Sequence, residues 1–453
     1  MDYTYIFDPS INLCTSHNIT QQKLSFYENL QMVNKLTPSY NICTVDYPSS
    51  KYCDIKKYNI LKEIQNCYDV DKDFFAKIRN LSNPFEFIGY SIFKNRAGVK
   101  LANIDAVLNI TKKSGFTFDK KQSSDNFTFC DIASGPGAFT QYLQYRYPNS
   151  KGYGITIRHE FNDWNTKILN MNNFTPYYGP DNSGDLYTNC LNFIEFVKEK
   201  EPNGVDLVTG DGAFDNTYDN LEEFNSSRLL LTQIIIGIDC TKINGNFVVK
   251  VLDTVNEFSA QLIYILSLCF KSILLFKPCS SRPASSERYL VCLNRNEQVF
   301  SYLSILKNAL PYYNNNDYLK SIFSDDLSKV DLQKVDGSIL PKPSGQVDGT
   351  FGSILPQDFI DWLTLNNNVS INLRLLIGRN ILYIMRYLSP HINFDSNINN
   401  LMYYINKTLQ TKELDDETKS KLYFLKNNIV QYDINKFLTI WNLPDNINKL
   451  IKF

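Results

Sequence analysis

The stretch that decides the fold is FTFCDIASGPGAF, residues 127–139. A run of β-branched and aromatic residues ends at Ile132, a glycine-rich turn follows, and helical spacing begins at Phe139. Gly135 and Gly137 let the backbone approach a ligand closely, and the free N–H groups at the start of the next helix favour a polar or anionic group. The pattern predicts a strand, a ligand-binding turn and a helix. A turn that only packs a helix on a strand has the same sequence pattern.

Short β-branched runs alternate with amphipathic helical segments on both sides of this turn, from about residue 85 to residue 297. We expect strands at 127–132, 152–157, 175–178, 205–209, 246–252, 272–276 and 288–293, and helices at 139–147, 229–238 and 258–270. Such alternation is typical of a parallel sheet covered on both faces. The predicted fold class is therefore α/β, with a Rossmann-like, mostly parallel sheet, helices on both faces and helical N- and C-terminal extensions.

Changes in composition and hydrophobic periodicity divide the chain into four parts. We predict an N-terminal accessory region at 1–78, a main domain at 79–300, a linker or extended segment at 301–356 and a helical C-terminal accessory domain at 357–453. Helical spacing outside the main domain occurs at 21–33, 58–68, 359–373, 378–388, 397–409, 417–429 and 433–441. The linker carries GSILP twice, which is too short a repeat for a solenoid.

Composition excludes several classes of function. The 46 basic and 47 acidic residues give a net charge of −1, which argues against nucleic-acid binding through bulk positive charge. Three histidines far apart in sequence offer little to a zinc enzyme or a hydrolase with a histidine base, and the ten cysteines form no CxxC pair. The sequence therefore requires no metal.

The N-terminus and the apolar runs bear on localisation. MDYTYIFDPS has no secretory pattern, and the apolar stretches 229–238 and 262–276 are too short or too broken to span a bilayer. We expect an intracellular protein without membrane association. The bias towards Asn, Ile, Lys and Tyr suggests an AT-rich viral or protist genome, so we expect the nucleus for a cellular protein and the cytoplasm or virion for a viral one.

The glycine turn favours one cofactor over another. A dinucleotide site needs GxGxxG, but Thr140 takes the place of the third glycine, and no acid ends the next strand in GYGITIRHE. The small turn fits S-adenosylmethionine, which carries no pyrophosphate. Asp185, in GPDNSGDLYT, could meet its adenine or ribose, although an aspartate there also suits a turn or a helix N-cap.

Four charged residues stand at the ends of predicted elements. Asp211 ends the strand in VDLVTGDG, and Lys250 lies within the apolar strand NFVVKVLD, where a lysine is costly unless paired or functional. Glu287 precedes the last strand in SSERYLVC, and Lys100 lies in the amphipathic stretch FKNRAGVKLANIDAVL. Taken separately, Lys250 suits a structural salt bridge, Glu287 a surface acid and Lys100 a solvated helix charge. Together they form a Lys, Asp, Lys, Glu set.

These motifs resemble the FtsJ-type RNA 2′-O-methyltransferases, and most closely the eukaryotic and viral enzymes that form cap-1 mRNA. The supporting strings are SNPFEFI, NRAGVKLANID, CDIASGPGAFTQYL, GYGITI, GDGAF, FVVK and above all KPCSSRPASSERYLVC. The resemblance covers about residues 79–297. It implies the class I methyltransferase fold, S-adenosylmethionine as methyl donor with S-adenosylhomocysteine as product, capped mRNA as substrate, and a catalytic tetrad of Lys100, Asp211, Lys250 and Glu287.

The resemblance also implies the remaining site residues. S-adenosylmethionine contacts are assigned to Asn95, Ala133, Ser134, Gly135, Pro136, Gly137, Ala138, Phe139 and Asp185. Capped-RNA contacts are assigned to Arg79, Asn220, Leu221 and Glu222. Arg282 and Lys277 are further candidates for phosphate or cap contacts, because arginine and lysine bind phosphate oxygens.

The chemistry needs a proton acceptor, because a ribose 2′-hydroxyl is a poor nucleophile. Burial and a second cation lower the pKa of a lysine from about 10.4. We therefore expect Lys250 to act as the base or to steer the 2′-oxygen, with Asp211 orienting it and attracting the sulfonium. Lys100 and Glu287 would position the ribose.

The predicted function is an mRNA cap 2′-O-methyltransferase that converts cap-0 to cap-1 on the first transcribed nucleotide of m7GpppN-capped RNA. Three alternatives stay open: methylation of the second nucleotide, methylation of rRNA, and a catalytically silent subunit of a capping complex that binds S-adenosylmethionine or RNA. Other capping or transcription proteins are candidate partners of the C-terminal helical region.

Overall fold

The computed structural model describes most of the predicted main domain and parts of its flanks. Its described residues are 40–43, 48–67, 75–76, 93–111, 126–212, 221–278, 280–313, 318–323 and 355–388. The predicted helical patterns at 21–33, 397–409, 417–429 and 433–441 lie outside these residues, as does most of the predicted linker.

A seven-stranded sheet forms the centre of the molecule, with the strand order β4-β3-β2-β5-β6-β8-β7. Its strands are β2 (Thr128–Ile132), β3 (Lys151–Ile155), β4 (Phe174–Tyr177), β5 (Val205–Gly210), β6 (Thr241–Val251), β7 (Phe270–Phe276) and β8 (Arg288–Arg295). Neighbours from β4 to β6 are parallel, whereas β8 is antiparallel to both β6 and β7. The seven predicted strands are confirmed, with ends that differ by up to five residues.

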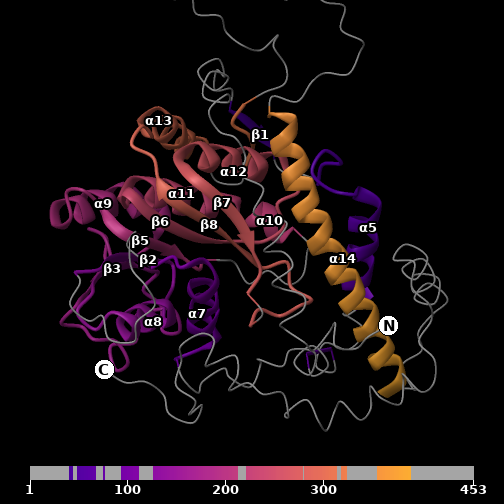
Figure 1. Cartoon of the computed structure of the whole chain (residues 1–453), viewed down its shortest axis with the longest axis horizontal. Helices are drawn as coiled ribbons and strands as arrows, with labels where there is room; N and C mark the ends of the chain where they lie inside the picture. Colours follow the sequence, from indigo (N-terminus) through magenta and orange to yellow (C-terminus); the bar gives the residue numbers. More distant parts are fainter. Residues whose placement is uncertain are drawn as a thin grey trace, which may run out of the picture.

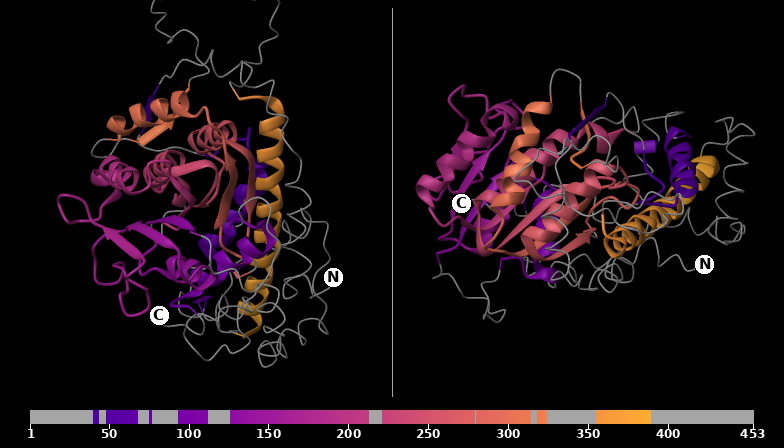
Figure 2. Two further views of the ribbon diagram at one scale, coloured as in Figure 1. Left: turned by 60° about the vertical axis from the view of Figure 1, so that its left-hand side comes forward. Right: turned by 90° about the horizontal axis from the view of Figure 1, so that it is seen from above.

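Helices cover both faces of this sheet (Figures 1 and 2). One face carries α9 (Leu186–Lys200), α11 (Ser227–Cys240), α12 (Glu257–Cys269) and α13 (Phe300–Ala309), and the other carries α7 (Arg96–Leu108) and α8 (Ala138–Arg146). The short α10 (Glu222–Asn225) precedes α11. The predicted α/β class with a Rossmann-like sheet is therefore confirmed.

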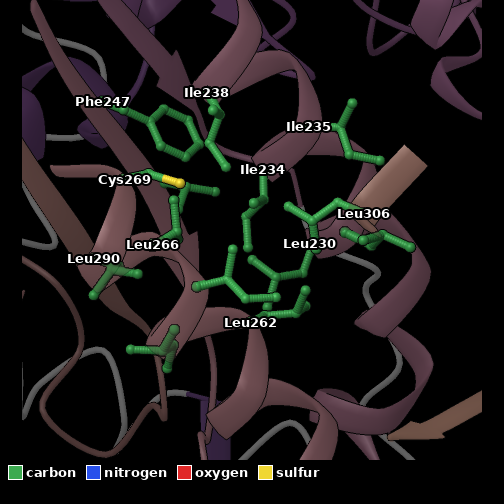
Figure 3. Packing of buried hydrophobic residues seen from close by; sticks show 14 of the residues in the cluster. Leu230, Ile234, Ile235, Ile238, Phe247, Leu262, Leu266, Cys269, Leu290 and Leu306 are labelled. Carbon is green, nitrogen blue, oxygen red and sulfur yellow. The ribbon is translucent and has the colours of Figure 1, made fainter. Parts of the chain in front are cut away.

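The larger of two buried apolar clusters lies between the sheet and the α9–α13 face. Figure 3 shows its centre, where Leu230, Ile234 and Ile238 of α11 meet Leu262 and Leu266 of α12. Strand side chains alternate between the two clusters: in β6, Phe247 and Val249 belong to the larger one and Val248 to the smaller one under α7 and α8. This alternation decides which face receives Lys250.

Two helices flank this domain. α5 (Ile55–Cys67) confirms the pattern at 58–68, and α14 (Gln357–Leu388) runs alongside it (Figure 1). The patterns at 359–373 and 378–388 prove to be one helix, because the interior Gly378 costs only about 1 kcal/mol and the flanking Arg374, Leu375 and Ile377 are buried.

Several elements were not predicted. α9 and α13 are absent from the predicted helices, and α13 and β9 (Tyr318–Ser321) occupy the start of the predicted linker. β9 pairs with β1 (Asn41–Cys43) in a separate two-stranded sheet. The pairing joins strands far apart in sequence, which a local pattern does not reveal. The domain boundaries themselves stay predictions.

In the described part of the chain, no helix is both long enough and apolar enough to cross a membrane.

Candidate active site

The glycine turn is anchored by an aspartate that the sequence analysis did not single out. Asp131, fully buried in β2, accepts hydrogen bonds from the Thr140 amide (3.1 Å), the Thr140 hydroxyl (2.7 Å) and the Thr209 hydroxyl (2.8 Å). Burial raises the pKa of Asp131 to about 6, against the hydroxyl hydrogen bonds that lower it. Thr140, in the place of the dinucleotide motif's third glycine, therefore ties α8 to the end of β2.

The turn requires its glycines. A Cβ at Gly135 would lie 1.6 Å from the carbonyl oxygen of Asn162, and Gly137 has a φ of +104°. Gly137 is the N-cap of α8 and offers no side chain to the first N–H groups of the helix. The backbone is therefore shaped for close approach by a ligand, with a helix N-terminus beside it.

The parallel strands bring the charged residues to one edge of the sheet. Asp211 follows β5 and Lys250 is the penultimate residue of β6. Glu287 directly precedes β8, and because β8 is antiparallel to β6, its start lies at the same edge. Lys250 lies opposite Tyr289 in the ladder, and Tyr289 belongs to the apolar cluster under α7. Lys250 thus shares the face that α7, with Lys100, covers.

The four predicted catalytic residues form two ion pairs. Lys250 Nζ lies 3.1 Å from Asp211 Oδ1, and Lys100 Nζ lies 2.7 Å from Glu287 Oε1 and 2.9 Å from Oε2. Their side chains are 12–15% exposed, so they are sheltered but open to solvent. The structure therefore brings all four together, from three strand ends and one helix.

The two pairs interact with each other. Burial acts to raise the pKa of Glu287, but Lys100 and then Lys250, together with a hydrogen bond from Ser281 (2.6 Å), hold it well below its usual range. Glu287 is thus a carboxylate facing two lysines. Positive and negative charges alternate across the site, an arrangement that can hold a polar substrate between them.

Tyr289 is a further residue of this site. Its hydroxyl donates a 2.7 Å hydrogen bond to Asp211 Oδ1, the oxygen that also faces Lys250. Burial, and then Asp211, raise the pKa of Tyr289 well above its usual value, so the hydroxyl stays protonated. The tyrosine follows Glu287 by two residues in SSERY. Its role depends on the register between β6 and β8, which the sequence pattern does not specify.

The prediction that Lys277 contacts RNA is wrong. Its side chain is buried, and Nζ donates to the carbonyl oxygens of Ser285 (2.8 Å) and Glu287 (3.0 Å). Burial lowers the pKa of Lys277 to about 7, against the attraction of Glu287. Lys277 therefore closes the 277–287 turn from inside and helps to place Glu287.

Several other predicted contacts have local structural roles. Asn95 and Asp185 are the N-caps of α7 and α9, where their side chains accept from the amides of Ala97 and Tyr187. The N-cap interpretation of Asp185 is confirmed, and its contact with a cofactor stays a prediction, as does that of Asn95.

The predicted RNA contacts are only partly described. Leu221 is the N-cap of α10, and Glu222 Oε2 accepts a 3.0 Å hydrogen bond from the Ser286 hydroxyl. Arg282 is half-buried in the 277–287 turn. Arg79 and Asn220 lie outside the described residues. The contacts of all five with RNA stay predictions.

Within the described ranges, no group of three or more histidine, cysteine, aspartate or glutamate residues has a metal-binding arrangement.

The fold and the site together define a class of protein. A seven-stranded sheet with one antiparallel strand next to its edge strand and a glycine turn after β2 are features of the Rossmann-like methyltransferase fold. A Lys-Asp-Lys-Glu cluster lies at the carboxyl edge of this sheet. Residues 93–295 match the model of the FtsJ-like methyltransferase family. The match confirms the resemblance that the sequence motifs predicted.

Curated relatives extend the similarity. The cap-specific mRNA (nucleoside-2′-O-)-methyltransferase 1 of Ailuropoda melanoleuca is 32% identical over 287 residues, which is 59% of this chain and 34% of that protein. The Drosophila melanogaster protein of the same name is 32% identical over 325 residues, 66% of this chain and 40% of that protein. The Mus musculus protein is 34% identical over 259 residues, 54% and 31% respectively. The matches thus span only 31–40% of each relative's length.

Proposed function

We propose that this chain methylates the ribose 2′-hydroxyl of the first transcribed nucleotide of m7GpppN-capped RNA, with S-adenosylmethionine as donor and S-adenosylhomocysteine as product. The observation that carries the proposal is the contact of Lys250 with Asp211 and of Lys100 with Glu287, beside the glycine turn. Three relatives named for cap-specific nucleoside-2′-O-methylation support the substrate.

The turn after β2 fits the donor. Gly135 and Gly137 leave no room for side chains, and the N-terminus of α8 lies beside them, so the donor's amino-acid end can lie along residues 133–139. When bound, S-adenosylmethionine supplies a methyl group on a positively charged sulfur. Asp211, at the neighbouring strand end, is the carboxylate that attracts this positive charge.

The four charged residues divide the chemistry. In methyl transfer the 2′-oxygen would bond to the methyl carbon while the sulfur–carbon bond of the donor would break to leave S-adenosylhomocysteine, and the hydroxyl proton would have to leave. Lys250, in its uncharged state, accepts that proton and directs the oxygen, while Asp211 holds the lysine in place at 3.1 Å. The Tyr289 hydroxyl also donates a hydrogen bond to Asp211 Oδ1, which weakens the attraction between this carboxylate and Lys250. Lys100 and Glu287 fix the ribose from the other side.

Cap recognition rests on residues near the 277–287 turn and α10. Glu222 accepts a hydrogen bond from Ser286, next to Glu287, and Arg282 lies in the 277–287 turn. Arg79, Asn220 and Leu221 complete the proposed set. A few placed cations suffice for a triphosphate-linked guanosine, so the net charge of −1 is compatible with this substrate. We further propose other capping or transcription proteins as partners of the C-terminal helical region. The proposed compartment is the nucleus for a cellular protein and the cytoplasm or virion for a viral one.

The test is a methylation assay with the purified chain. RNAs that begin m7GpppN, GpppN and pppN, together with rRNA, are incubated with radiolabelled S-adenosylmethionine, and nuclease digests are analysed by mass spectrometry. We expect a 2′-O-methyl group on the first nucleotide of m7GpppN-RNA.

The same assay separates the alternatives. Label on the second nucleotide or on rRNA would replace the proposed substrate. Binding of S-adenosylmethionine without transfer to any of these RNAs would instead identify a silent subunit. The assembled ion pairs argue against that outcome, since a silent subunit has no need to keep two partly exposed lysine–carboxylate pairs in contact.

A further inference from the structure

The helices α5 and α14 lie outside the family match at 93–295 but contact residues at the ends of the strands that carry the site. Figure 1 shows α14 beside α5 along one flank of the sheet. The two segments are joined by hydrogen bonds from the Asp54 amide to Asn368 Oδ1 (2.7 Å) and from the Thr364 hydroxyl to the Lys51 carbonyl (2.9 Å). They therefore form one accessory unit, which we name the α5–α14 clamp.

The clamp holds the end of β6 through a buried acid. Asp253 lies three residues after Lys250. Its carboxylate accepts from Arg374 Nη1 of α14 (2.5 Å) and from the Tyr58 hydroxyl of α5 (3.2 Å), and Lys62 Nζ of α5 is 3.6 Å away. Burial acts to raise the pKa of Asp253, but Arg374 and Lys62 hold it well below its usual range. Both helices thus contact the chain two residues after the end of β6, the strand that presents Lys250.

The clamp also holds the start of β8. Arg288, between Glu287 and Tyr289, is buried and donates to Asn367 Oδ1 of α14 (2.9 Å) and to the Thr254 hydroxyl (3.0 Å). Asn367 in turn accepts from the Thr254 hydroxyl (2.6 Å) and donates to the Thr254 carbonyl (2.8 Å). A single side chain of α14 therefore joins the residues that follow Lys250 to the residue that follows Glu287.

From these contacts we propose that the α5–α14 clamp positions the active site, with Arg374 and Asn367 as positioning residues for Lys250 and Glu287. The inference rests on the proposed function. It means that the segment 93–295 is not a self-sufficient catalyst: the spacing between its two ion pairs is set from outside it. A displacement of about 1 Å at a reacting group can cost about 100-fold in rate.

A purely structural role predicts a different result. In that case, loss of the contacts would lower the stability of the protein but leave the folded fraction fully active. A buried amide in the middle of β6 supplies the matched control. Asn246 donates to the Ile110 carbonyl (2.7 Å) and accepts from the Asn294 amide (2.9 Å), so it also links separate segments. It contacts neither strand end at the site.

The experiment compares Asn367→Ala with Asn246→Ala in the full chain. Activity on m7GpppN-RNA is normalised to the folded fraction, and the Kd for S-adenosylmethionine is measured by calorimetry. We expect Asn367→Ala to lower kcat about 10- to 100-fold with the Kd within about twofold, since the glycine turn follows β2, which is two strands from β6 and three from β8. Asn246→Ala should retain kcat within about twofold. Equal kcat losses in the two variants would overturn the proposal.

A second pair of variants tests the charge at Arg374. Arg374→Lys keeps a cation next to Asp253, whereas Arg374→Met removes it. We expect the lysine variant to retain at least about fivefold more kcat than the methionine variant at equal folded fraction. Equal kcat values in the two variants would contradict a positioning role for Arg374.

Hydrogen exchange separates failure of this inference from failure of the proposed function. Amide protection is measured at 250–256 and 286–291 in wild type and in Asn367→Ala, without any RNA. We expect faster exchange at both segments and unchanged exchange at 128–134. If the wild type methylates no RNA, the proposed function fails while this readout still tests the clamp. Unchanged exchange at both strand ends would overturn the clamp even if the enzyme is active.

Discussion

The two ends of the central strands carry similar ions in different settings. At the amino ends, Asp206 pairs with Lys242, and Asp239 pairs with both Lys198 and Lys307. The lysines there are 34–42% exposed, whereas those at the carboxyl end, Lys100 and Lys250, are only 12–13% exposed.

The difference in exposure changes what an ion pair can do. A lysine that reaches water is screened and contributes little beyond local stability. Sheltered charges act on one another more strongly, because less water screens them. Similar residue pairs therefore stabilise the fold at one end of the sheet and form a candidate reactive site at the other, so matched substitutions at the two ends should have different effects.

The largest contrast is expected between two lysines of one strand. Lys250→Ala should lower kcat on capped RNA by about 10³-fold, within the range for loss of a general base. Lys242→Ala, at the other end of β6, should leave kcat within about twofold, because its partner Asp206 is far from the site. Single-turnover methyl transfer measures both. Near-equal rates in the two variants would remove the distinction between the two ends.

The next contrast uses the aspartates at the two ends of β5, Asp206 near its start and Asp211 directly after its end. Asp211→Asn should lower kcat by about 100-fold, since it removes the charge that orients Lys250. Asp206 lies at the amino end of β5, where its carboxylate accepts a hydrogen bond from the Thr128 amide (2.9 Å) and pairs with Lys242. The substitution Asp206→Asn removes this charge. It should lower the melting temperature while sparing kcat. Loss of kcat in Asp206→Asn at full folding would count against this assignment.

A smaller effect is expected from Tyr289→Phe, which removes one hydroxyl and keeps the ring. Asp211 then acts on Lys250 alone, and the lysine holds its proton more firmly. We expect kcat near neutral pH to fall about 10-fold and the acidic limb of the pH–rate profile to move to higher pH. The groups that face this hydroxyl and its acceptor are Lys250, Glu287, Arg96 and Asp131.

The control for that variant is Tyr153→Phe. The Tyr153 hydroxyl also donates to a carboxylate, Glu201, at 2.9 Å, but on β3 at the amino edge of the sheet. Its pH–rate profile should coincide with that of the wild type. A profile of Tyr289→Phe that does not move would show that the hydroxyl has no influence on the lysine.

The smallest effect concerns stability and Lys277. Its pKa is lowered to about 7 in the folded protein, so between pH 7 and about 10 the unfolded chain binds more protons than the folded one. The free energy of unfolding should therefore rise with pH over that window, by at most about 1.4 kcal/mol per pH unit. Urea unfolding of wild type and Lys277→Met at pH 7, 8 and 9 tests this. The variant should lack this rise, and parallel curves would contradict it.

Local patterns predicted much of the sheet and of the site. Strands with β-branched runs and helices with regular spacing were placed to within a few residues, because side-chain periodicity follows from backbone geometry. The glycine turn was predicted because few other residues suit its backbone. Lys250 was singled out because a lysine inside an apolar strand is costly without a partner.

Other features depend on segments far apart in the sequence. Lys277 was predicted to contact RNA, and only the folded 277–287 turn shows that it is buried and bound to two carbonyl oxygens. Tyr289 faces Asp211 through the register of β6 and β8, and β1 pairs with β9 across most of the chain. None of these contacts leaves a periodic signal.

By itself, then, the sequence determined the α/β class, the glycine turn and the identity of the four charged residues, because each depends on the properties of a residue and its near neighbours. Only the tertiary structure decided that Lys100 meets Glu287, that Tyr289 shares an oxygen of Asp211 with Lys250, and that Arg374 and Asn367 of α14 hold the two strand ends. The physical reason is that ion pairs and hydrogen bonds act over a few ångströms of space, and the folded chain alone brings these residues within that range.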